Sequence, residues 1–115
     1  MPTSDSRELQ AFKAEFFKAL AHPLRIRILE LLLTRARTVQ ELQAELSLEQ
    51  PVVSQQLAVL RAKNIVGARK VGTAVRYAVR DPHLRELLAV ARRIFNGHLI
   101  GTQAMLRELR REGRR

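Results

Sequence analysis

The side chains that most often perform catalysis or bind metals are few in this sequence and lie far apart. The chain has no cysteine, and its three histidines, His22, His83 and His98, lack the spacing of a nucleophile and its base. Without cysteine it can form no disulfide, no thiolate metal site and no thiol nucleophile. It also lacks a glycine-rich phosphate loop. We therefore expect no enzymatic activity and no cofactor.

Charge suggests a different chemistry, the binding of a polyanion. Lysine and arginine number 21 and aspartate and glutamate 11, which leaves a formal charge of +10. Residues 1–49 carry seven basic and seven acidic side chains, whereas residues 50–80 carry six basic side chains and no acidic one. A block without acids predicts a face that binds nucleic acid, and a solvated basic surface is the alternative explanation.

A helix predicted over residues 51–63 opens this acid-free block. Its apolar residues recur at i, i+4 and i+7: Val53, Leu57 and Leu60. Ser54, Ala58 and Arg61 lie on the opposite side, with Gln55 beside them. Small residues let a helix enter the major groove of DNA, and amides can pair with adenine edges. These are the features of a recognition helix, although an ordinary amphipathic surface helix shares them.

The recognition helix needs a short partner helix before it. Thr38 and Glu41 form a capping box that opens a helix over residues 38–46. Only residues 47–50 separate this helix from the recognition helix, so the pair is predicted to form a helix-turn-helix.

Two further helices are predicted at the start of the chain. Residues 7–20 place one apolar stripe at spacings of three and four: Leu9, Phe12, Phe16 and Leu20. His22-Pro23 then interrupts the pattern and starts a second helix over residues 23–34. The inward residues of this second helix are predicted to be Leu24, Ile28, Leu31 and Leu32.

A β-hairpin is predicted after the recognition helix. Residues 66–71 and 74–80 alternate in the manner of strands, and Gly72-Thr73 joins them in a tight turn. Arg69 and Lys70 precede this turn, so the hairpin is basic near its tip. A basic ribbon beside a recognition helix is a wing suited to contacts with the DNA backbone and the minor groove.

The last predicted helix covers residues 82–111, with Asp81 as its N-cap. Its apolar stripe is longer than one small domain can cover, which indicates a partner: Leu84, Leu88, Ala91, Phe95, Leu99, Thr102, Met105 and Leu109. Asn96-Gly97 and Gly101 would suit a helix end, a kink or the close approach of a second helix. We favour a continuous helix.

The length of 115 residues fits one domain. We expect a flexible N-terminus over residues 1–6, one winged helix-turn-helix domain over 7–112 and a basic tail over 113–115. The N-terminus lacks the basic and apolar regions of a secretory signal, and the longest uncharged stretch, 94–106, is too short and too polar to span a bilayer. We therefore expect a cytoplasmic, nucleoid-associated protein and no membrane partner.

Three segments together resemble the ArsR/SmtB family of bacterial winged-helix repressors. They are residues 18–29 (KALAHPLRIRIL), 50–61 (QPVVSQQLAVLR) and 70–77 (KVGTAVRY), and the resemblance extends in order over residues 10–95. It implies a mainly α fold with a β-hairpin wing (α+β), a winged helix-turn-helix. It also implies a homodimer through the first and last helices that represses transcription by binding double-stranded DNA at an imperfect inverted repeat.

The resemblance and the helix patterns assign the site residues. The predicted DNA contacts lie on the recognition helix and the wing: Gln50, Val52, Ser54, Gln55, Gln56, Arg61, Arg69, Lys70, Thr73 and Arg76. The predicted dimer contacts lie on the first and last helices: Leu9, Phe12, Phe16, Leu84, Leu88, Ala91, Phe95 and Leu99. Gln56 lies close to the apolar side of its helix, so a structural amide and a base contact are equal alternatives there. His22 and Arg25 fall in the family's structural second-helix motif, and we interpret them as polar scaffolding.

The departures from the family concern metal sensing. Many relatives have cysteines at the start of the third helix, where residues 38–43 of this chain offer no thiol. Asp81 and His83 match the first half of a zinc site on the last helix, but its second half falls on residues that cannot ligate, Ile94 and Gly97. His98 lies at an unsuitable spacing for the four ligands that zinc requires. We therefore expect no metal, and the effector stays unidentified.

Two alternatives stay open. A nonspecific architectural nucleoid protein would use the same charge without reading bases. The apolar seam between the first and last helices would also suit a small-molecule pocket, although an apolar stripe at helical spacing favours plain dimer core.

Overall fold

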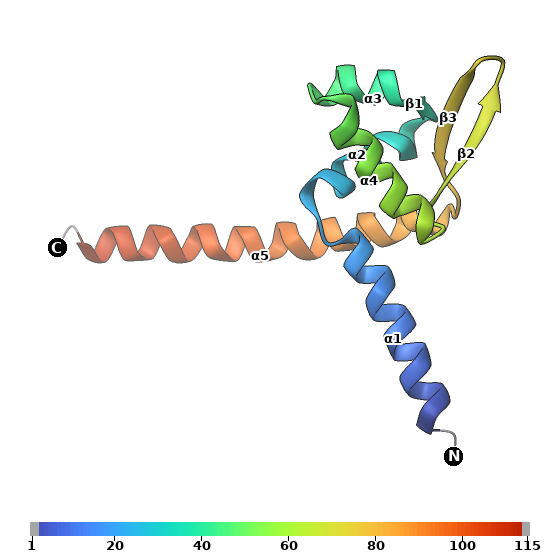
Figure 1. Ribbon diagram of the computed structural model, residues 1–115. Coiled ribbons are helices and arrows are strands. Elements are labelled where there is room, and N and C mark those ends of the chain that lie inside the picture. The colour runs from blue at the N-terminus through green and yellow to red at the C-terminus, as the bar shows by residue number, and fades with distance from the viewer. Residues whose placement is uncertain (1–2, 114–115) are drawn as a thin grey trace. The chain divides into compact units, whose positions relative to one another are not determined.

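The computed structural model describes residues 3–113 and separates into two compact units, Met1–Asp81 and Pro82–Arg115. The described part of the first unit contains four helices and three strands (Figure 1). In chain order they are α1 (Thr3–Leu20), α2 (Pro23–Thr34), β1 (Arg37–Thr38), α3 (Val39–Leu46), α4 (Gln50–Ala62), β2 (Val66–Val71) and β3 (Ala74–Val79). The described part of the second unit contains one helix, α5 (His83–Gly113).

The first two helices form where the apolar spacing predicts them. α1 begins at Thr3, earlier than the predicted start at residue 7, and residues 1 and 2 lie outside the described part. α2 has the predicted bounds. His22 is its N-cap, with an extended backbone and with Nδ1 accepting a hydrogen bond from the backbone N–H of Leu24 at 3.1 Å. Pro23 follows in the first turn, where its missing N–H leaves no unmet hydrogen bond.

The core of the first unit is aliphatic. Its buried side chains come from every helix of the unit and from the start of the hairpin: Ala19, Leu20, Ile28, Leu29, Leu32, Leu42, Leu46, Val53, Leu57, Leu60, Ile65 and Val66. The predicted inward face of α2 is correct for Ile28 and Leu32. It is wrong in omitting Leu29, which is fully buried, whereas Leu24 and Leu31 are only half-buried. α2 is therefore surrounded on more than one side, which a single-stripe pattern does not reveal.

The sheet is antiparallel and has the strand order β1-β3-β2. The predicted hairpin is confirmed, since Val71 pairs with Ala74 across a two-residue turn. Gly72 has a φ of +64°, a conformation that glycine adopts without steric cost. β1 was not predicted, because two residues are too few to show an alternating pattern. It makes β3 the central strand, with Arg37 opposite Tyr77 and Thr38 opposite Arg76.

α5 is a continuous helix of 31 residues that includes Asn96 and Gly97. The prediction of continuity is confirmed, and within residues 3–113 the only non-glycine residues with positive φ are Ser47 and Asn64, both outside α5. Several large apolar side chains of α5 are exposed: Val90, Ile94, Phe95, Leu99, Ile100, Met105, Leu106 and Leu109. No described helix is both long enough and apolar enough to cross a membrane.

Candidate nucleic-acid interface

Hydrogen bonds fix both ends of α3, including the turn that leads into α4. The predicted capping box is present: Thr38 Oγ1 accepts from the Glu41 backbone N–H at 3.1 Å, and Glu41 Oε1 accepts from the Thr38 backbone N–H at 3.0 Å. At the other end Ser47 adopts a left-handed conformation, with φ of 56°, and its N–H donates to Gln43 O. The chain then enters α4 at Gln50, with Pro51 in the first turn. The two helices therefore meet at a short, hydrogen-bonded turn.

α4 presents the two faces that the sequence predicts. Val53, Leu57 and Leu60 are at most 1% exposed and face the core. On the other side Gln50, Val52 and Gln55 are exposed, and Ser54 is half-buried. The exposed group is small or carries an amide, which is the chemistry needed for contact with base edges in a major groove.

Gln56 makes a contact within the protein. Arg25 Nη1 donates to Gln56 Oε1 at 3.0 Å, and Arg25 Nε donates to the carbonyl of Ala19 at 2.6 Å. Both side chains are half-buried. Arg25 thereby joins α4 to the end of α1, which fits its interpretation as scaffolding and favours the structural alternative for Gln56.

The wing carries its predicted basic side chains on an exposed tip. Arg69, Lys70 and Thr73 are all exposed. Arg69 lies directly opposite Arg76 in the hairpin register, and no acidic residue lies on either strand. Like charges facing each other across two strands are unfavourable unless an anion neutralises one of them.

For Arg76 that anion is Glu41. Arg76 Nη1 lies 3.1 Å from Glu41 Oε1, and Arg35 Nη1 lies 2.9 Å from Glu41 Oε2. The backbone hydrogen bond from Thr38, and then the one from the Arg35 side chain, lower the pKa of Glu41 from 4.5 to about 2. Glu41 thus completes the capping box and forms ion pairs with two arginines, and the pair with Arg76 links the wing to the start of α3.

Arg37 is also part of this region and, unlike half-buried Arg76, it is buried, which the sequence did not predict. Arg37 is 6% exposed, and its Nε lies 2.6 Å from Glu45 Oε2. Its Nη1 donates to Leu31 O and to Thr34 Oγ1, the latter at 2.9 Å, so it closes the C-terminal end of α2. Charged residues are rarely buried unless paired, so composition alone gave no sign of this role.

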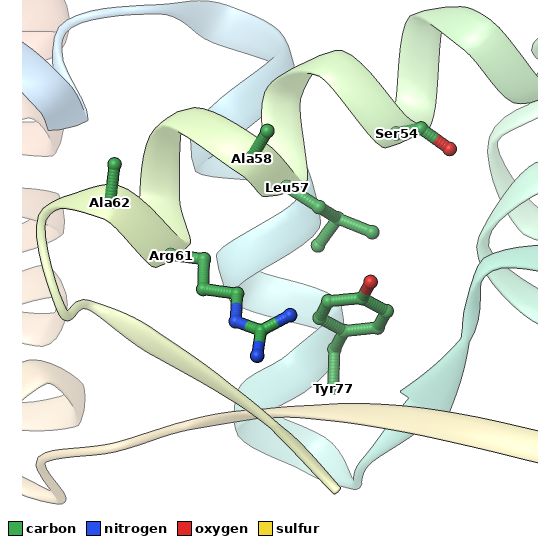
Figure 2. A pocket seen from close by; sticks show the side chains of 6 residues that line it. All are labelled: Ser54, Leu57, Ala58, Arg61, Ala62 and Tyr77. Atoms are coloured by element: carbon green, nitrogen blue, oxygen red, sulfur yellow. The ribbon is translucent and has the colours of Figure 1, made fainter. Parts of the chain in front are cut away.

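A hollow of about 350 Å³ separates α4 from β3 (Figure 2). Its lining comes from the outward face of α4 and the central strand: Ser54, Leu57, Ala58, Arg61, Ala62 and Tyr77. Tyr77 was not among the predicted site residues, although it is the last residue of the 70–77 segment that carries the family resemblance. The structure brings it together with two predicted DNA contacts, Ser54 and Arg61.

All the predicted dimer residues except Leu84 are exposed or half-buried. On α1, Leu9 and Phe12 are 54% and 73% exposed, and half-buried Phe16 packs edge-on against Phe17. On α5, Leu84 is buried, Leu88 and Ala91 are half-buried, and Phe95 and Leu99 are exposed. Within residues 3–113, no three His, Cys, Asp or Glu side chains lie close enough together to hold a metal ion.

Comparison with known proteins supplies the family. Residues 22–67 match the family described as bacterial regulatory protein, arsR family. The chain is 49% identical over 110 residues to the HTH-type transcriptional regulator Rv0081 of Mycobacterium tuberculosis, covering 95% of this chain and 96% of that protein. It is 39% identical over 79 residues to a probable mercury resistance operon repressor of Streptomyces lividans, covering 69% of this chain and 63% of that protein.

Solved structures agree with the sequence comparison. The crystal structure of M. tuberculosis Rv0081 has a TM-score of 0.76 at 51% identity, covering 81% of this chain and 94% of that chain. The solution structure of the homodimeric winged helix-turn-helix domain of Mb0332 from Mycobacterium bovis has a TM-score of 0.75 at 28% identity, covering 82% and 87%. The chain therefore belongs to the arsR family of bacterial regulatory proteins, and its winged helix-turn-helix is that of a DNA-binding transcriptional regulator.

Proposed function

We propose that the protein is a homodimeric repressor that binds an inverted-repeat operator. The observation that carries this proposal is the acid-free stretch that forms α4 and the hairpin, which exposes amides on the helix and basic side chains on the wing. Relatives described as repressors support the direction of regulation. The protein acts in the cytoplasm, with DNA as its partner and without enzymatic chemistry.

Within this proposal the two elements of the surface have different roles. Exposed residues of α4 read base edges in the major groove: Gln50, Val52 and Gln55. Exposed residues of the wing contact the backbone and the minor groove: Arg69, Lys70 and Thr73. Gln56 and Arg76 mainly support this surface through contacts within the protein, because Gln56 is bound by Arg25 and Arg76 is bound by Glu41.

The dimer follows from the uncovered apolar faces of α1 and α5. Side chains such as Phe12 and Phe95, which are 73% and 66% exposed, are too apolar to favour contact with water, and contiguous exposed apolar faces mark interaction sites. The homodimeric state of Mb0332 supports the same assembly here. A two-fold dimer presents two copies of the DNA-binding surface, which match half-sites about 34 Å apart.

A footprinting experiment tests the proposal. The full chain is incubated with its own promoter region and digested with DNase, and affinity is then compared between the protected duplex and a scrambled duplex at one salt concentration. We expect a protected inverted repeat and a ratio of affinities of about 10³ or more. A ratio near one without any protected repeat would instead support the architectural alternative, which the names of the relatives do not favour.

A further inference from the structure

The hollow between α4 and β3 gathers hydrogen-bond donors that have no partner among residues 3–113. We propose that it binds one phosphodiester group of the DNA backbone, held by the Arg61 guanidinium and the Tyr77 hydroxyl. Ser54 lies at the end of the hollow nearest the N-terminus of α4. The inference rests on the proposed function and deepens it, since it assigns a backbone contact to Tyr77 and moves Ser54 from base reading to backbone binding.

The sheet holds Tyr77 in place from both sides. It lies on the central strand, opposite Ala68 of β2 and Arg37 of β1. Figure 2 shows its hydroxyl directed toward α4 and the Arg61 side chain extending toward its ring. Because the ring is half-buried and its strand is paired along both edges, the hydroxyl is presented from a rigid element.

The chemistry of the lining selects an anion. Within residues 3–113 the side chains of Ser54, Arg61 and Tyr77 make no hydrogen bond or ion pair with another residue. All three can donate, and no carboxylate lines the hollow. Ala58 and Ala62 contribute only methyl groups, which leaves the space above the helix open. Guanidinium and hydroxyl donors are the groups that proteins place on phosphate oxygens.

The position of the hollow identifies which phosphate it meets. The recognition helix enters the major groove, and the wing contacts the adjacent minor groove. The sugar-phosphate strand that separates these two grooves must pass between the two elements. The lining residues come from those two elements alone, α4 and β3. A phosphodiester held there would fix the register of the recognition helix without carrying sequence information.

Two variants of the full chain test the inference on the footprinted operator duplex and on a scrambled duplex. Tyr77→Phe removes the donor and keeps the ring, and it should weaken binding to both duplexes by about tenfold, because the bond that it removes goes to a charged group. Arg61→Gln should also weaken both and should reduce the slope of log K against log salt by about 0.9. Arg107→Gln makes the same charge change on an exposed site of α5 and should leave the slope unchanged.

A methylphosphonate scan locates the contact. Each phosphate of one half-site is replaced in turn by an uncharged methylphosphonate. One replacement should weaken the wild-type protein and have little further effect on Tyr77→Phe or Arg61→Gln. The inference would be overturned if the effects of the methylphosphonate and of the protein variant were fully additive at every position, or if Tyr77→Phe bound as well as the wild type. In either case, operator binding by the wild-type protein would keep the proposed function intact. A wild-type protein that binds no duplex would remove both.

Inorganic phosphate distinguishes a DNA backbone from a free anion. It is titrated against the operator complex at constant ionic strength, with chloride as the replacement salt. We expect phosphate to compete no better than chloride. Competition specific to phosphate that disappears in Tyr77→Phe would assign the hollow to a free anion and would overturn the phosphodiester assignment.

Discussion

Arg76 on the wing and Glu41 at the start of α3 form an ion pair, with 3.1 Å between Nη1 and Oε1, although 35 positions separate them in the chain. The contact is reinforced by the pairing of Thr38 with Arg76 between β1 and β3. Since Glu41 also closes the capping box of α3, the wing is joined to the helix-turn-helix through one carboxylate. The ionised Glu41 carboxylate therefore adds a side-chain contact to the backbone pairing that holds the wing.

Replacing Glu41 by Gln should make stability less dependent on pH in acid. The pKa of Glu41 is lowered in the folded chain to about 2 from 4.5, so its stabilising contribution is complete above pH 4.5 and disappears as the pH falls toward 2. The difference in unfolding free energy between wild type and Glu41→Gln should thus be largest at neutral pH and smallest near pH 2. Urea titrations at pH 7, 4 and 2 measure it. A difference that does not change over this range would contradict the assigned ion pairs.

The two arginines that face each other on the wing should contribute unequally to DNA binding. Arg69 has no ion pair with any residue of the described chain 3–113, whereas Arg76 shares the Glu41 carboxylate with Arg35. Arg69→Gln should reduce the salt slope of log K by about 0.9, the value for one released counterion, and Arg76→Gln should reduce it by less. Binding isotherms at several salt concentrations provide both slopes. Equal losses would show that DNA displaces Glu41 from Arg76.

Substitutions at two neighbouring glutamines of α4 should affect protein stability and DNA recognition separately. Gln56→Ala removes the acceptor of Arg25 Nη1 and should lower the unfolding free energy by about 1 kcal/mol or somewhat more, because the donor is charged. Gln55→Ala is the matched control on the exposed face, and it should leave stability unchanged while reducing discrimination between operator and scrambled duplex. Thermal unfolding and competition binding of both variants test this division. Reduced discrimination by Gln56→Ala at unchanged stability would restore the base contact.

Local patterns predicted most of the fold, whereas contacts between distant segments were not predictable. The bounds of α2, the capping box of Thr38 and Glu41, and the hairpin register at Gly72 each depend on residues a few positions apart. β1 exists only because β3 pairs with it, and Arg37 is tolerated inside only because Glu45 and the end of α2 provide acceptors. The same limit applies to the site. Composition located its charge, but the neutralised Arg76 and the donors around Tyr77 required three-dimensional neighbours.

A charge on the apolar stripe of α5 should dissociate the proposed dimer. Leu99→Glu places a carboxylate where a second copy would bury 55%-exposed Leu99, and burying an unpaired charge is strongly unfavourable. Ala104→Glu is the control, since it adds the same charge on another side of the same helix, away from the stripe. Sedimentation should show a monomer for Leu99→Glu and a dimer for Ala104→Glu, with operator affinity lost only in the former. A dimeric Leu99→Glu would place the interface elsewhere.

Substitution of two glycines of α5 should distinguish a free helix face from a close helix–helix contact. Gly97 and Gly101 lie four positions apart on α5, and a Cβ added to either meets no atom of the described residues within 4 Å beyond the neighbouring backbone of its own helix. In a helix interior alanine is more favourable than glycine by up to about 1 kcal/mol, so Gly97→Ala and Gly101→Ala should each raise the unfolding temperature and leave the dimer dissociation constant unchanged. Calorimetry and sedimentation of both variants measure the two quantities. A weakened dimer in either variant would show that a second helix approaches α5 there, because only a close backbone contact makes a methyl group unfavourable.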